Sequence, residues 1–196
     1  KLFEQVEQYR RPGTLITSNT SGIPIHMMAE GRSDDFKKHF CGTHFFNPPR
    51  YLRLLEIIPT PHTDPAIVEF LMSYGDLYLG KTTVLCKDTP AFIANRIGVF
   101  GMMAIMNVKE KLKLSVDEID ALTGPIIGRP KSATFRTGDI SGIDVLAHVA
   151  ASTGAVTGED FALPGWIHQL IAAGRLGEKT GGGFYRKEKQ GILTLD

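Results

Sequence analysis

The spacing of apolar residues changes once along the chain, near residues 88–90, and this change restricts the fold more than any other feature. Before it, apolar runs of strand length alternate with segments of helical spacing. After it, helical spacing dominates. Alternating helices and strands are typical of an α/β sheet domain, so the sequence predicts an α/β domain at residues 1–89 and an all-α domain at residues 90–196, with helix predominant overall.

The elements expected in the first part are short and are separated by proline or glycine. Pro48 and Pro49 force a turn between two apolar runs, and Gly80 ends a helix. The predicted elements are helices at 2–9, 23–29 and 63–80, and strands at 14–18, 40–46, 52–58 and 82–86.

The elements expected in the second part are mainly helices. A long apolar segment predicts a helix at 92–106, and Ser115 with Glu118 forms a capping-box pattern that opens another. Two more helices are expected at 143–151 and 166–173. The glycine-rich stretch 177–183 lacks the context of a phosphate-binding loop and predicts a flexible tail.

Charge and cysteine usage exclude several classes of function. The chain has 22 basic and 21 acidic residues, a balance that gives no general field for nucleic acid. Cys41 and Cys86 lie in strand-like runs without a CxxC pattern, so we expect buried free thiols and no metal site. No apolar stretch reaches membrane-spanning length and the N-terminus lacks signal-peptide zones, so a cytoplasmic protein is expected.

His44 and Glu56 are the first candidates for chemistry. They lie twelve positions apart on two strand-like runs, and if these runs pair, the imidazole and the carboxylate can face each other. A carboxylate that bonds one ring nitrogen makes the other nitrogen a general base. The alternative is a strand histidine and a solvent-facing charge, and the spacing alone favours that alternative.

Two further polar positions have similar ambiguity. Ser21 lies in a polar loop directly after a strand, where open α/β sheets bind ligands, but such loops also serve as turns and helix caps. Asn95 lies in an otherwise apolar helix, where its amide would contact either a loop or a substrate.

Five segments, taken together, carry a resemblance to a known family. They are SNTS at 18–21, GTHFFNP at 42–48, LLEII at 54–58, DTPAFIANR at 88–96 and KTGGGFY at 179–185. In this order and near this spacing they resemble the L-3-hydroxyacyl-CoA dehydrogenase family over essentially the whole chain. The resemblance implies the C-terminal remainder of a Rossmann-type NAD-binding domain, followed by a helical 6-phosphogluconate-dehydrogenase-C-terminal-like domain that forms dimers.

The resemblance also implies roles for six residues. His44 would take the proton from the 3-hydroxyl group and Glu56 would orient it. Ser21 and Asn95 match positions that bind the reacting oxygen and its surroundings. The cofactor NAD would be contacted by Ser21, Asn47 and Lys179.

Parts of the family pattern would precede Lys1. The GxGxxG segment and the acidic ribose-binding residue do not occur in the 196 residues, so the resemblance implies a truncated chain that alone binds NAD poorly and turns over little. The stretch 128–136 and Phe100-Gly101 are similar to the dehydrogenase part of multifunctional fatty-acid oxidation proteins, which implies a fused or associated enoyl-CoA hydratase domain in the parent.

The function expected from the resemblance is the oxidation of L-3-hydroxyacyl-CoA to 3-ketoacyl-CoA in fatty-acid β-oxidation, with hydride transfer to NAD. Two alternatives remain at this point. One is a non-catalytic helical dimerisation or assembly module, and the other is a dehydrogenase of a different β-hydroxy acid.

Overall fold

The structure is a computed structural model that describes residues 1–158, 160–189 and 191–195, without the side chain of Val156. The chain divides into two units, Lys1–Asn95 and Arg96–Asp196. The division falls six residues beyond the predicted boundary, because Phe92 packs into the core of the first unit and the amides of Ile93 and Ala94 bind Glu56. The assignment of residues 1–89 and 90–196 to a cofactor domain and a dimerisation domain stays a prediction.

The first unit is built around a four-stranded sheet in the order β1-β2-β3-β4. Strand β2 pairs in parallel with β1 and in antiparallel with β3, and β3 pairs in parallel with β4. The strands are β1 (Ile16–Ser18), β2 (Phe40–Phe45), β3 (Leu54–Pro59) and β4 (Thr82–Leu85). All four predicted strands are confirmed, with ends that differ by one or two residues.

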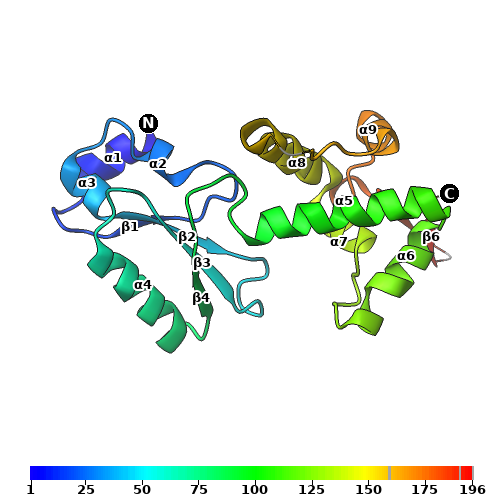
Figure 1. Cartoon of the computed structure of the whole chain (residues 1–196), viewed down its shortest axis with the longest axis horizontal. Helices are drawn as coiled ribbons and strands as arrows, with labels where there is room; N and C mark the ends of the chain where they lie inside the picture. Colours follow the sequence, from blue (N-terminus) through cyan, green and yellow to red (C-terminus); the bar gives the residue numbers. More distant parts are fainter. Residues whose placement is uncertain (159, 190, 196) are drawn as a thin grey trace. The chain divides into compact units, whose positions relative to one another are not determined.

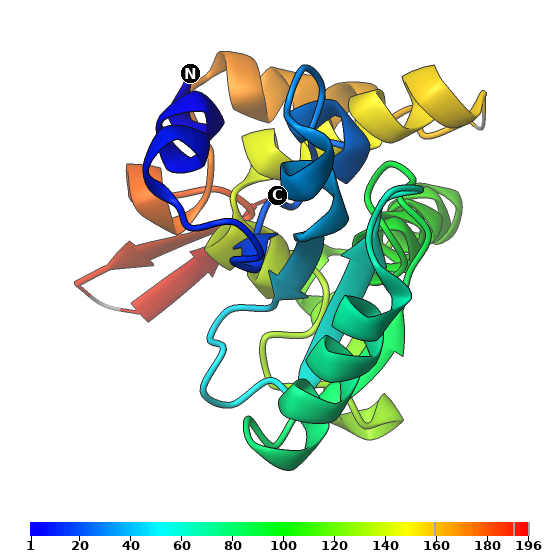
Figure 2. The same ribbon diagram turned by 90° about the vertical axis from the view of Figure 1, so that its left-hand side faces the viewer.

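Helices cover both faces of this sheet (Figure 1). They are α1 (Leu2–Tyr9), α2 (Ile25–Met28), α3 (Asp34–Lys38) and α4 (Pro65–Leu77). The side chains of one face pack with α1, α2 and α3, and those of the other face pack with α4, which runs along β3 in Figure 2. The sequence did not predict α3, a five-residue helix capped by Ser33.

Gly42 allows α2 to lie close to the sheet. A Cβ built at this position would lie 2.8 Å from Ile25 and 3.0 Å from Ile58, both of which are fully buried. Side chains alternate along a strand, so Gly42 and His44 face the same side. The absence of a side chain at Gly42 therefore brings α2, and the loop before it, onto the face that carries His44.

The second unit is mainly helical, as predicted. Its helices are α5 (Ala94–Leu112), which begins two residues before the unit does, α6 (Val116–Thr123), α7 (Phe135–Ser141), α8 (Ile143–Thr157) and α9 (Gly165–Ala172), with 3-10 turns η1 (Pro125–Ile127) and η2 (Glu178–Thr180). The capping box of Ser115 and Glu118 is confirmed at the start of α6. The predicted helix at 92–106 instead begins at Ala94, because Ala91 and Phe92 have left-handed backbones.

The C-terminal region corrects the prediction of a flexible tail. Gly177 and Gly182 form a β-bridge, and the chain continues into a hairpin of β5 (Tyr185–Glu188) and β6 (Gly191–Thr194), red in Figure 2. The buried carboxylate of Asp139 accepts hydrogen bonds from the amides of Phe184 and Tyr185, each 2.8 Å long. A Cβ on Gly177 would collide with the backbone of Asp139, so glycine is required for this turn.

Candidate active site

His44 and Glu56 are directly paired residues of the antiparallel strands β2 and β3. Paired residues point to the same face of a sheet, so the two side chains meet above it. Nδ1 of His44 lies 2.7 Å from Oε2 of Glu56, and both residues are almost fully buried. The two strand-like runs therefore pair, as contact between His44 and Glu56 requires. Glu56 is not a solvent-facing charge.

The second carboxylate oxygen of Glu56 is held by the start of α5. The backbone amides of Ile93 and Ala94 donate to Oε1 over 3.1 and 2.8 Å. Burial opposes ionisation of Glu56, but the hydrogen bond from His44 and those from the two amides outweigh it, so the pKa of Glu56 lies below its usual value. The carboxylate is therefore ionised at neutral pH.

Ser21 contacts the opposite side of the imidazole ring. Its Oγ lies 3.1 Å from Nε2 of His44. An ionised carboxylate can only accept a hydrogen bond, so the proton of the neutral ring is assigned to Nδ1, which leaves Nε2 as an acceptor. Such a ring can take a proton at Nε2. The rings of Phe46 and Phe92, centred 4.5 and 5.5 Å from the imidazole, flank it.

The loops around His44 carry the other polar candidates of this unit. Strands β1 and β2 are parallel, so their carboxyl ends lie at one edge of the sheet. The loop after β1 carries Ser21 and the loop after β2 carries Asn47, and both side chains are exposed. Asn95 is half-buried and directly follows the amides that hold Glu56.

Lys179 belongs to the second unit. Its Nζ lies 2.6 and 2.7 Å from the two carboxylate oxygens of Asp144, in an ion pair that is exposed on both sides. The structure brings His44, Glu56 and Ser21 together, whereas the cofactor contacts assigned to Asn47 and Lys179 and the role of Asn95 stay predictions.

Sequence reasoning missed the main-chain groups that hold Glu56, because backbone amides have no residue-type signal. It also missed that Cys86 lies beside Glu56. Burial, together with the negative charge of Glu56, raises the pKa of the Cys86 thiol to about 12, so this thiol stays protonated. Both cysteines are buried and free, as predicted.

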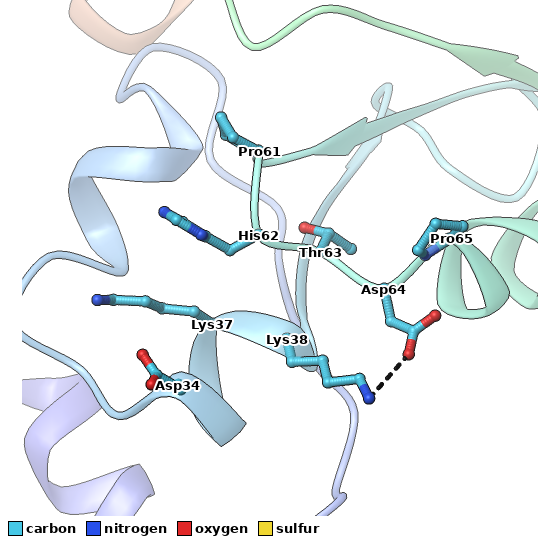
Figure 3. Close-up of a pocket in the computed structure, with 8 residues that line it drawn as sticks. All are labelled: Asp34, Lys37, Lys38, Pro61, His62, Thr63, Asp64 and Pro65. Carbon is cyan, nitrogen blue, oxygen red and sulfur yellow. Dashed lines mark ion pairs between the residues drawn. The ribbon is translucent and has the colours of Figure 1, made fainter.

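A separate hollow lies beside the β3–α4 loop (Figure 3). Lys37 and His62 reach into it, while Lys38 is paired with Asp64 over 3.3 Å. This hollow is at the far end of β2 from His44, because residue 59 pairs with Cys41. The two aspartates that line it balance the charges of the two lysines, and we assign it no function.

The described residues form neither a metal-binding cluster nor a membrane-spanning helix. No cluster of three or more histidine, cysteine or acidic side chains could hold a metal ion in this part of the chain. None of its helices has both the length and the apolar character that crossing a membrane requires.

Family models of known proteins match both parts of the chain. Residues 1–89 match the family model of the 3-hydroxyacyl-CoA dehydrogenase NAD-binding domain, and residues 92–187 match that of the C-terminal domain. NAD is thus the cofactor of this family's N-terminal domain.

Curated relatives cover nearly the whole chain. A probable 3-hydroxyacyl-CoA dehydrogenase of Deinococcus radiodurans is 50% identical over 96% of this chain and 55% of its own length. Another, from Bacillus subtilis, is 52% identical over 100% of this chain and 25% of its own length. The chain therefore spans about half the length of the first of these relatives and a quarter of the second.

A solved structure has the same fold. The (S)-3-hydroxybutyryl-CoA dehydrogenase of Ralstonia eutropha superposes with a TM-score of 0.86 at 27% identity, over 96% of this chain and 65% of that protein. With both family models matched in order along the chain, this protein belongs to the 3-hydroxyacyl-CoA dehydrogenase family.

Proposed function

We propose that this chain supplies the proton-accepting site and the helical domain of an NAD-dependent L-3-hydroxyacyl-CoA dehydrogenase. The observation that carries the proposal is the buried pairing of His44 with Glu56, which leaves Nε2 facing Ser21. Family membership supports the reaction class. The curated relatives, which are named probable 3-hydroxyacyl-CoA dehydrogenases, support the acyl-CoA substrate.

The chemistry follows from the two ring nitrogens. Oxidation of a 3-hydroxyl group to a ketone removes the hydroxyl proton and a hydride from C3. His44 takes the proton at Nε2, and the ionised Glu56 stabilises the imidazolium that forms. Bound NAD supplies the hydride acceptor. The rings of Phe46 and Phe92 keep the imidazole in place while its charge changes.

The remaining polar residues act on the substrate and the cofactor. Ser21 and Asn95 orient the reacting oxygen, and Ser21 and Asn47 lie along the cofactor, with Lys179 as a further cofactor contact. The exposed side chains of Ser21 and Asn47 fit this role, since they follow the carboxyl ends of parallel strands, where open α/β sheets bind dinucleotides.

The surroundings of the site complete the proposal. The adenosine half of NAD is bound by residues outside these 196, so the 196-residue chain alone turns over little. The protein works in fatty-acid β-oxidation as a homodimer through residues 90–196. A linked hydratase domain is supported by relatives that are named fatty acid oxidation complex trifunctional enzymes.

The experiment that tests this function is a substrate assay of the full native polypeptide that contains this sequence. NADH formation is followed with L-3-hydroxyacyl-CoA thioesters of several chain lengths, with the D-enantiomers as the matched control. We expect turnover of the L-thioesters only. Turnover of free 3-hydroxy acids without thioester turnover would indicate a different β-hydroxy acid dehydrogenase. No turnover of either, with an intact dimer, would indicate an assembly module.

A further inference from the structure

Asp88 holds the start of helix α2 from a distant position in the sequence. Its Oδ1 accepts from the amide of Ile25 and its Oδ2 from the amide of His26, both over 2.7 Å. Pro24, at the N-cap position of α2, makes no side-chain cap. The Asp88 side chain, only 8% exposed, therefore replaces the missing cap across 62 to 63 residues of chain.

The loop that carries Ser21 ends at this cap. It runs from the end of β1 at Ser18 to the start of α2 at Ile25. Near its first end, Oδ1 of Asn19 accepts from the amide of Phe45 over 2.9 Å. Ser21 lies between the two anchors and is exposed, so the anchors rather than packing determine where its hydroxyl lies.

Asp88 also begins the segment that holds Glu56. The chain continues from Asp88 through the left-handed Ala91 and Phe92 to the amides of Ile93 and Ala94, which bind the Glu56 carboxylate. Residues 88–94 thus bear on both hydrogen bonds made by His44. The amides of Ile93 and Ala94 bind Glu56, which bonds Nδ1, and Asp88 caps α2, which follows the loop that brings Ser21 to Nε2.

We propose that Asp88 is a positioning residue, which acts through the start of α2 to hold the Ser21 hydroxyl against Nε2 of His44. The effect of Asp88 on kcat rests on the function proposed above. The structural coupling of Asp88 to Ser21 and His44 does not. The coupling passes through the capped amides. His26 also contributes its Nδ1, 2.6 Å from Asp88, but its side chain is 49% exposed and such pairs add little stability.

The test uses NMR of the native polypeptide without substrate. The measured quantities are the 15N resonances of the His44 ring and the hydrogen-exchange rates of the amides of Ile23, Ile25 and His26, which are hydrogen-bonded in the structure. The variants are Asp88→Ala and the isosteric Asp88→Asn, which guards against failure to fold. Asp64→Ala is the matched control, because Asp64 caps α4 in the same unit by accepting from the amide of Ala66 over 2.9 Å. His26→Gln removes only the side-chain contact.

We expect Asp88→Ala to shift the Nε2 resonance of His44 and to accelerate exchange of these three amides by tenfold or more, with a smaller effect of the same sign for Asp88→Asn. Asp64→Ala and His26→Gln leave the Nε2 resonance unchanged. In turnover assays, Asp88→Ala and Ser21→Ala are expected to lower kcat non-additively, since they remove the same contact.

The proposal is overturned if both Asp88 variants lower Tm but leave the His44 ring resonances as in the wild type, since Asp88 would then only stabilise the fold. That result would not affect the proposed function. Conversely, a wild-type protein without dehydrogenase activity would remove the function and leave the coupling measurement valid.

Discussion

Glu56 and His44 occupy directly opposed positions on β3 and β2, and a 2.7 Å hydrogen bond joins Oε2 to Nδ1. The strand register positions the two side chains, while the amides of Ile93 and Ala94 fix the carboxylate from behind. Nδ1 of the imidazole is therefore hydrogen-bonded to Glu56, and Nε2 faces Ser21.

Replacing Glu56 with glutamine should reverse the tautomer of His44. The amide group of glutamine can donate to Nδ1, so the ring proton moves to Nε2, which then cannot accept a proton from substrate. The 15N shifts of the ring nitrogens report the tautomer directly. Glu69→Gln, at an exposed position of α4, is the control. An Nδ1-protonated ring in Glu56→Gln would show that Glu56 does not set the tautomer.

The lowered pKa of Glu56 predicts a loss of stability in acid. A carboxyl group whose folded pKa lies below its unfolded value, near 4.5, stabilises the fold above that pH and loses this contribution as pH falls through the folded pKa. Denaturant unfolding at pH 7, 5, 4 and 3 should therefore show a steeper fall in the free energy of unfolding for the wild type than for Glu56→Gln. Parallel curves would contradict the assignment.

Relieving the left-handed backbone at Ala91 should stabilise the first unit. Ala91 has a φ of 61°, which costs a residue with a Cβ about 1–2 kcal/mol. Glycine adopts this conformation freely but gains about 0.4–1 kcal/mol of unfolded-state entropy. We expect Ala91→Gly to raise the free energy of unfolding by about 0.5–1 kcal/mol. The control, Ala66→Gly in α4, should lower it by a similar amount. Equal destabilisation by both would show that Ala91 is unstrained.

Asp139 should be the side chain on which the C-terminal turn depends most. Its two oxygens accept hydrogen bonds from the backbone amides of Phe184 and Tyr185. In Asp139→Asn, the side-chain NH2 group would face one of these two N–H donors and could not accept its hydrogen bond. Leaving a buried donor unpaired costs about 1–3 kcal/mol. Thermal unfolding of this variant is compared with Glu178→Gln, which removes the charge of the ion pair between Glu178 and Arg136 and leaves both carboxylate oxygens of Asp139 in place. Equal Tm values would contradict the role of Asp139.

The order and type of most elements were predictable from local pattern. Helix α1, all four strands of the first sheet and the capping box of α6 follow from apolar spacing, proline and capping residues. The short helix α3 has too few residues for a periodic signal. The C-terminal turn was missed because its order depends on Asp139, which is remote in sequence.

The candidate site was predictable only in its side chains. The spacing of His44 and Glu56 allowed them to face each other only if the two strands pair, and by itself it favoured the alternative. The pairing is an observation of the structure. The cap by Asp88 and the amides at the start of α5 depend on long-range packing, which a pattern of residue types does not encode. Lys179 lies in the other unit, paired with Asp144, so its cofactor contact stays a prediction.

Proton acceptance by His44 is tested by measuring the kcat of His44→Ala in the full native polypeptide. A general base contributes about 10²–10⁴-fold, so a loss of kcat of this size is expected, while KM changes little. His62→Ala, an exposed histidine at the far end of the sheet, should retain wild-type turnover. A loss of less than tenfold for His44→Ala would show that His44 is not the general base.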